Sequence, residues 1–227
     1  MASPGESSLK APPAASGLLD RLHEVAVRLD SQRVLLANGA VIALLGLLGI
    51  MYLVSGSPLT VFDLDGERNA PSTYSAFLWT CLSVLALLVG RAEPRPRAAR
   101  VWQALSLPLL LVAADEFGEI HERLERITGI DWQILYSPLG LVAVVLWVVV
   151  GQRLRELQAG FGLFVAGTVC GFVSQVVEAV EYGPHDREVS AFDELVVIEE
   201  LLEMVGAVLV GLALLAALRA VSRRPRT

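Results

Sequence analysis

Six long apolar segments constrain the fold of this chain more than any other feature of its sequence. Each is about as long as a helix that crosses a hydrocarbon core of about 30 Å, which takes roughly 20 residues. They occupy residues 34–54, 73–90, 101–120, 132–151, 160–181 and 192–220. Because lipid cannot hydrogen-bond to exposed backbone groups, spanning segments form helices unless they close a barrel. Hydrophobic residues make up 54% of the chain, and the sequence predicts an all-α fold, a polytopic membrane bundle of six transmembrane helices.

Polar segments flank this membrane domain. We predict that residues 1–33 form a cytoplasmic tail. Within it, apolar and charged residues alternate from Leu18 to Asp30 at the spacing of an amphipathic helix, which we expect to lie on the membrane surface. The six spans form one domain over residues 34–220, and residues 221–227 form a basic cytoplasmic tail. The N-terminal tail lacks a short apolar stretch followed by a small-residue cleavage site, so we expect no cleaved signal peptide.

The charged residues predict an orientation. If both termini are cytoplasmic, the cytoplasmic segments hold every Lys and Arg residue except Arg68, Arg123, Arg126 and Arg187, in agreement with the positive-inside rule. The same placement leaves most Asp and Glu residues on the opposite side. The sequence therefore predicts a multi-pass protein of a bacterial cytoplasmic (inner) membrane, with an acidic face on the extracytoplasmic side.

The third, fifth and sixth spans carry carboxylates at this outer end, although they do not all cross the membrane in the same direction. Counted from residue 101, Asp115 lies about 21 Å and Glu119 about 27 Å into the membrane. Ionisable groups at such depth are costly and are functional candidates. We predict an outer-leaflet, carboxylate-rich site that binds one or two divalent metal ions. Its predicted ligands are Asp115, Glu119, Glu122, Glu178, Glu181, Glu200 and Glu203.

Helical spacing groups these ligands. The acids of the third span recur at i, i+4 and i+7 and share one face, and the pairs in the fifth and sixth spans are three residues apart. His121 lies about 100° from Glu122 around the helix, so it joins the site only if the helix unwinds or ends at a crowded junction. His121 therefore ranks below the carboxylates. The supporting or alternative ligands are Glu116, His121, Glu199, Asp63 and Asp65.

The pattern does not select one metal. Carboxylates that project from facing helices are typical of di-iron and di-manganese proteins, but the Glu-x-x-His pair of those sites is missing because Gly118 stands three residues before His121. An oxygen-rich site also suits hard cations. Iron, manganese, calcium, magnesium and zinc all stay candidates, and a membrane metalloenzyme is one form of this function.

Two other functions stay open. The first is a proton- or cation-coupled transporter or channel that uses the same acids as a relay, although the inner halves of the acidic spans hold almost no ionisable residues. The second is a non-catalytic accessory subunit of a membrane complex, in which the acids fix helix packing. Gly167 and Gly171 form a Gly-x-x-x-Gly pair that predicts close helix packing and a homo-oligomer contact.

Several classes of protein are excluded. Lys10 is the only lysine and lies in the tail, so a retinal Schiff base cannot form in the membrane. No nucleotide-binding loop or nucleophile elbow occurs. Three histidines are too few for bis-histidine haem sites. The basic residues suit anionic lipid rather than nucleic acid, so the predicted partner is the lipid bilayer.

Two motifs carry a resemblance to other proteins. One is the loop Phe62-Asp-Leu-Asp-Gly-Glu67, and the other is the helix end Asp115-Glu-x-x-x-Ile-His-Glu122. In these, the chain resembles uncharacterised multi-span bacterial integral membrane proteins that share an Asp-Leu-Asp-Gly-Glu loop and an acidic His-Glu helix end. The resemblance covers the first four spans and supplies no known activity. It implies that the loop and the helix end belong to one site.

Overall fold

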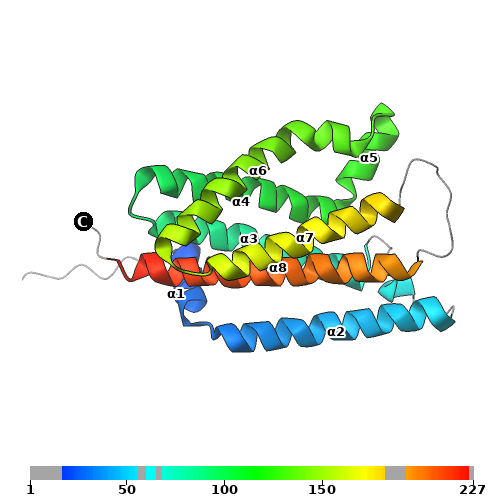
Figure 1. The fold of residues 1–227 in the computed structure, drawn as a ribbon, viewed down its shortest axis with the longest axis horizontal. Coiled ribbons are helices and arrows are strands. Elements are labelled where there is room, and N and C mark those ends of the chain that lie inside the picture. The colour runs from blue at the N-terminus through cyan, green and yellow to red at the C-terminus, as the bar shows by residue number, and fades with distance from the viewer. Residues whose placement is uncertain (1–16, 56–59, 65–67, 182–192, 225–227) are drawn as a thin grey trace, which may run out of the picture.

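The chain folds into a bundle of α-helices. A computed structural model describes residues 17–55, 60–64, 68–181 and 193–224, and no strand occurs within these ranges (Figure 1). The elements are α1 (Leu18–Arg28), α2 (Ser31–Ser55), the 3-10 helix η1 (Thr60–Phe62), α3 (Ala70–Ala92), α4 (Pro96–Gly118), α5 (Ile120–Thr128), α6 (Trp132–Leu157), α7 (Phe161–Glu181) and α8 (Asp193–Ser222).

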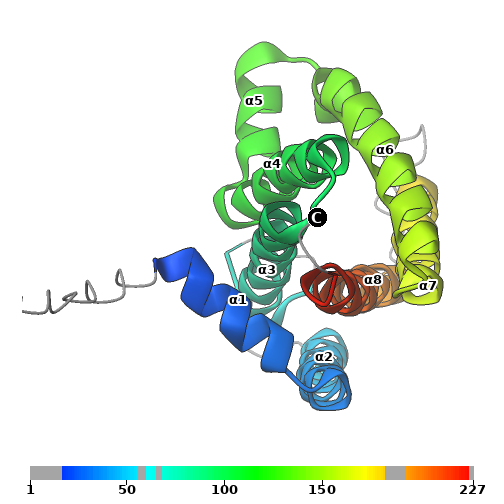
Figure 2. The ribbon, with the colours of Figure 1, turned by 90° about the vertical axis from the view of Figure 1, so that its left-hand side faces the viewer.

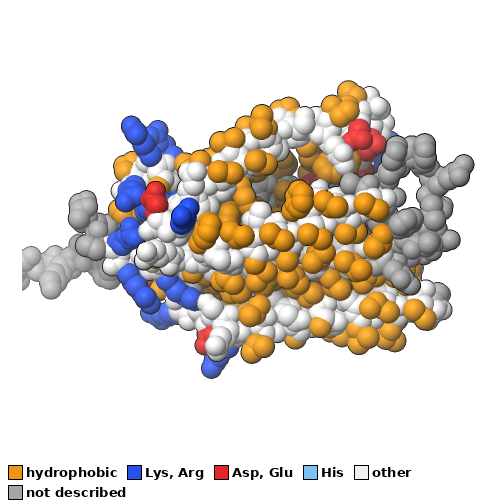
Figure 3. All heavy atoms as spheres, viewed as in Figure 1, with side chains coloured by type: hydrophobic (Ala, Val, Ile, Leu, Met, Phe, Trp, Pro, Cys, Tyr) orange, Lys and Arg blue, Asp and Glu red, His pale blue; other side chains and the backbone are white. Residues whose placement is uncertain are grey.

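Six of these helices are long and apolar enough to cross a membrane, as predicted: α2, α3, α4, α6, α7 and α8. They run side by side, and apolar side chains cover the middle of the bundle between two polar ends (Figures 1 and 3). We call the end with Arg91, Arg153 and Arg219 the basic end, and the opposite end, with Asp115 and Glu178, the acidic end. Which end faces the cytoplasm stays a prediction.

Helix α8 is the central element of the bundle. It packs against α2, α3 and α7. Its side chains Met204, Ala213, Leu214 and Leu218 are completely buried, which is unusual for a membrane helix with one lipid-facing side. Glu199, Glu200 and Glu203, in the first third of α8, are half-buried.

Small residues bring α7 close to α8. A β carbon on Gly167 would lie 2.7 Å from the carbonyl oxygen of Gly206, and one on Gly160 would lie 2.7 Å from Ala213 Cα. The close packing predicted for Gly167 thus occurs between two helices of the same chain, whereas Gly171 has open space beside its Cα. Self-association through this pair of glycines stays a prediction.

The predicted amphipathic helix is α1, which crosses the basic end at a steep angle to the spans (Figures 1 and 2). The Arg219 guanidinium near the end of α8 donates to Ser31 Oγ at 2.8 Å and to the carbonyl oxygens of Val27 and Leu29. Arg91 on α3 lies 3.3 Å from Asp20. These contacts hold α1 against the ends of α3 and α8.

Helix α6 is packed into the bundle mainly at the basic end. Its buried residues all lie between Val150 and Leu157. From there α6 diverges from α7 toward the acidic end, where it approaches α5 (Figure 1). Figure 3 shows the surface hollowed between α6 and the helices beneath it. The two ends of the bundle are therefore packed very differently.

Candidate functional site at the acidic end

The third predicted span ends earlier than its apolar pattern indicates. Helix α4 ends at Gly118, and Glu119 takes a left-handed backbone conformation with φ 50° and ψ 45° before α5 begins at Ile120. This conformation costs a residue with a β carbon about 1–2 kcal/mol. The predicted single face of Asp115, Glu119 and Glu122 is therefore wrong, because the i, i+4, i+7 spacing holds only along an unbroken helix.

The break brings His121 onto Asp115. The backbone N–H of His121 donates to Asp115 Oδ1 at 2.8 Å, and its ring Nδ1 lies 2.9 Å from Oδ2. Tyr136 Oη on α6 donates to Oδ1 at 3.2 Å. When Asp115 is ionised, Nδ1 is the donor, so the ring would meet a ligand or proton through Nε2. The helix therefore unwinds where the sequence required it to unwind for His121 to join the site.

Aromatic rings from α6 pack around this pair. The His121 and Trp132 ring centroids are 5.5 Å apart, and Trp132 meets Tyr136 edge-on at 6.1 Å. The side chains of Asp115 and His121 remain 18% and 25% exposed. The pair is therefore held in one geometry and still reachable from outside.

Glu178 and Glu203 extend the polar cluster across the bundle. Gln175 Nε2 donates to Glu178 Oε2 at 2.8 Å on α7, and Trp79 Nε1 on α3 donates to Glu203 Oε1 at 3.2 Å. Glu178 lies within electrostatic range of both His121 and Glu203. We call Asp115, His121, Tyr136, Glu178 and Glu203 the acidic-end site.

Two predicted ligands have other partners. Glu119 Oε2 forms an ion pair with Arg68 Nη2 at 2.8 Å. Glu122 pairs with Arg126 one turn later on α5 at 3.5 Å. An ammonium or guanidinium partner competes with a metal ion for the same oxygens, so these two residues do not belong to the acidic-end site in this structure.

The other predicted site residues lie around it or outside the described part. Glu199 and Glu200 are half-buried on α8, one turn before Glu203, and Glu116 is half-buried on α4. Asp63 interacts with the Tyr52 hydroxyl on α2, and its carbonyl oxygen accepts from Asn69. Asp65 and the side chain of Glu181 lie outside the described residues.

In this structure, the acidic-end site does not have the geometry of a metal centre. Within the described ranges, no three His, Cys, Asp or Glu side chains converge closely enough to hold a metal ion.

Tyr136 and Trp79 were not predicted from the sequence. Both are polar aromatic residues inside apolar spans, where a buried hydroxyl or indole N–H usually has a partner, and that pattern could have drawn attention to them.

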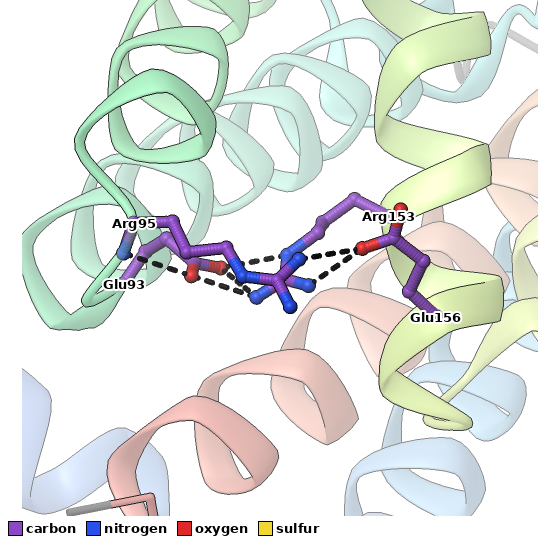
Figure 4. A network of polar contacts seen from close by, with 4 residues as sticks. All are labelled: Glu93, Arg95, Arg153 and Glu156. Atoms are coloured by element: carbon purple, nitrogen blue, oxygen red, sulfur yellow. Dashed lines mark hydrogen bonds and ion pairs between the residues drawn. The ribbon is translucent and has the colours of Figure 1, made fainter.

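A second polar cluster at the basic end was also missed. The Glu93 carboxylate accepts from Arg153 Nη2 at 2.7 Å and from its Nε at 2.9 Å (Figure 4). Glu156 Oε2 accepts from Arg153 Nη1 and from Arg95 Nη1, each at 2.8 Å. The side chains of Glu93 and Arg153 are only 0% and 7% exposed. This network ties the α3–α4 connection to the end of α6.

Comparisons with known proteins place the chain in a family. No curated protein and no solved structure matches it. One family model matches residues 34–218, which takes in most of all six candidate spans, and its description is Domain of unknown function (DUF8692). This agrees with the resemblance to uncharacterised proteins, whereas the loop and helix-end motifs stay a prediction. The chain belongs to the DUF8692 family.

Proposed function

We propose that the acidic-end site binds a divalent metal ion, with His121, Glu178 and Glu203 as ligands and Asp115 as the residue that positions His121. This ligand set replaces the larger carboxylate set of the sequence analysis. One imidazole and two carboxylates suit manganese, iron or zinc better than magnesium or calcium. With both termini cytoplasmic, as the basic residues predict, the metal would be reached from the extracytoplasmic side of a bacterial inner membrane.

The observation that carries this proposal is that Glu178 lies within electrostatic range of both His121 and Glu203. Glu178 and Glu203 are both half-buried in apolar helices. Like charges in a poorly hydrated place are unstable without a compensating cation. His121 is the basic group beside Glu178, and its Nδ1 is already engaged by Asp115.

The pairing of Asp115 with His121 supports the same conclusion. Histidines that bind metals usually donate their other ring nitrogen to a carboxylate or carbonyl, which fixes the tautomer and the ring orientation. Asp115 has this relation to His121 through both the ring and the backbone N–H. Tyr136 adds a third donor that holds the carboxylate.

Metal binding requires side chains of the acidic-end site to rearrange. Glu178 would turn away from Gln175, and Glu203 would turn away from Trp79, because these contacts now direct their carboxylates. Both present partners are neutral donors. Hydrogen bonds to neutral donors contribute only about 0.5–3 kcal/mol each, so a divalent cation can replace them.

The packing of the basic half supports a site that opens at one end rather than a channel. Val89, Trp102, Val150, Leu154 and Leu218 are completely buried there. A relay of protons or ions across the membrane would have to pass this apolar layer. Transport by the same acids stays a prediction, and flux into proteoliposomes that Glu203→Gln abolishes would support it instead.

Elemental analysis of the natively purified protein tests the proposal. We expect bound divalent metal in the unaltered protein and loss of most of it in His121→Ala and Glu203→Gln. In calorimetric titrations of chelator-treated protein, each variant should bind the metal at least about tenfold more weakly, equivalent to about 1.4 kcal/mol. Size-exclusion profiles and tryptophan fluorescence establish that the variants are folded.

Glu119→Gln is the matched control. It makes the same chemical change two residues from His121, at a carboxylate that is paired with Arg68, so the metal content should stay unchanged. If Glu119→Gln removes the metal as completely as Glu203→Gln, the ligand set proposed here is wrong and the larger set from the sequence is favoured. A folded, unaltered protein that neither contains nor binds a divalent metal would refute the function itself.

A further inference from the structure

We propose that a groove at the basic end binds the phosphate group of an anionic phospholipid. The groove lies between the start of α4 and the end of α6, next to the ion-pair network of Figure 4. This site is separate from the acidic-end site and does not depend on metal binding there.

The groove has the size and walls that a lipid head and the first part of its chains require. It encloses about 700 Å³. Val101 and Trp102 from α4 and Val149 and Val150 from α6 supply the apolar part of its lining. Four arginines line it as well, and three of them, Arg95, Arg97 and Arg100, are exposed. An apolar wall beside a cationic rim matches an amphiphile with a negative head.

The charges of the groove are not balanced. Glu93 and Glu156 pair with Arg153 and Arg95 and neutralise both guanidinium groups. Arg97 and Arg100 make no ion pair with any described residue and have no acidic neighbour in the groove lining beyond Glu156. Two guanidinium groups in excess next to a hollow favour an anionic ligand, because guanidinium binds phosphate through paired hydrogen bonds.

A buried donor in the same lining adds a second observation. Trp102 lines the groove and is completely buried. Its indole Nε1–H has no hydrogen-bond partner within the described part of the chain. Leaving a buried donor unsatisfied costs about 1–3 kcal/mol, so the surroundings of Trp102 would gain from an acceptor that the described residues do not supply.

A lipid is favoured over a soluble anion because the groove continues into the apolar surface. Its valines and Trp102 belong to helices that span the membrane. Basic pockets between membrane helices are known to bind the heads of anionic lipids. The basic residues of this end therefore have a role beyond setting the orientation in the membrane, since Arg97 and Arg100 line one defined groove.

Binding of phosphatidylglycerol to the full-length protein in detergent tests this proposal. Native mass spectrometry should show a bound lipid for phosphatidylglycerol but not for phosphatidylcholine with the same chains. The double variant Arg97→Gln/Arg100→Gln should bind phosphatidylglycerol at least about tenfold more weakly, or about 1.4 kcal/mol. The control, Arg223→Gln/Arg224→Gln, removes the same charge from exposed positions just after the end of α8 and should bind normally.

Three outcomes would overturn the proposal. Equal loss of binding in both double variants would mean that the lipid responds only to the overall charge of the basic end. Equal binding of phosphatidylcholine would mean that the groove does not recognise charge. Competition by glycerol 3-phosphate at concentrations similar to the lipid would identify the ligand as a soluble phosphate.

Discussion

The two ends of the bundle treat buried charge in opposite ways. At the basic end, Glu93 and Arg153 form a buried pair that Glu156 and Arg95 extend. At the acidic end, Glu178 lies within electrostatic range of Glu203 and of His121, which pairs with Asp115. The arginines of the first cluster balance its carboxylates, whereas the described residues of the second cluster carry more acidic than basic groups.

This difference distinguishes a cluster that is complete within the chain from the one for which we propose a metal ion. A buried ion pair with all partners present holds helices together, and removing one partner is what costs stability. A cluster with excess negative charge is less stable by itself and gains from a cation supplied from outside. The packing agrees, because α6 is buried at the basic end, between Val150 and Leu157, and diverges from α7 toward the acidic end.

Arg153→Met should have the largest effect. It leaves the Glu93 carboxylate, with 0% of its side chain exposed, without its cation. We expect a loss of about 3–5 kcal/mol in the free energy of unfolding, the usual cost of breaking a buried pair. Unfolding in mixed micelles with increasing SDS measures this quantity.

Two further variants test the cause of that loss. Glu156→Gln affects a carboxylate that is 57% exposed, so it should cost no more than about 1 kcal/mol. Replacing both members of the buried pair, as Arg153→Met/Glu93→Leu, should recover most of the stability. If Glu156→Gln is as costly as Arg153→Met, the contrast between the buried and the exposed parts of this cluster is wrong.

Glu203→Gln should change stability in the opposite direction. In chelator-treated protein, it replaces a half-buried carboxyl group by a neutral amide, and the amide oxygen can still accept from Trp79. We expect the free energy of unfolding to rise by no more than about 1 kcal/mol, because burial disfavours the charged form of the carboxyl group that the amide replaces. The same SDS titration measures the change. A loss of 2 kcal/mol or more in the free energy of unfolding would mean that Glu203 stabilises the fold, as Glu93 does. The two ends would then not differ in how they treat buried charge.

Arg68→Gln should have the smallest effect. The ion pair between Arg68 and Glu119 is short, at 2.8 Å, but Arg68 is 53% exposed, so water and salt screen the attraction. We expect a loss of about 0–1 kcal/mol in the free energy of unfolding. Arg126→Gln, which breaks the exposed pair with Glu122, serves as a comparison and should lose no more. A loss near that of Arg153→Met would show that the acidic end also depends on ion pairs for its fold.

The six spans could be predicted from the sequence because their cause is local. Each predicted segment is an apolar run that lipid favours as a helix whatever surrounds it. The structure places α3 at Ala70–Ala92 and α6 at Trp132–Leu157, close to the predicted segments 73–90 and 132–151. The amphipathic helix from Leu18 to Arg28 follows from periodicity in the same way.

The members of the site could not be predicted, since they depend on contacts between helices. Neither a glycine nor a proline marks position 119 itself, and the break there depends on Glu119 adopting a conformation unfavourable for its side chain. This one residue moves Glu122 off the face of Asp115 and brings His121 onto it. Tyr136 and Trp79 reach Asp115 and Glu203 from other helices.

The sequence by itself determined the number of candidate spans and the presence of one acidic and one basic end, and it predicted Asp115, Glu178 and Glu203 as site residues. These properties depend on the amino-acid composition of each segment, which can be read directly from the sequence. Only the tertiary structure decided which charges are paired. Pairing depends on distances of a few ångströms between helices, such as the 2.7 Å between Glu93 and Arg153, and these distances arise from the packing of α3, α6 and α8 together.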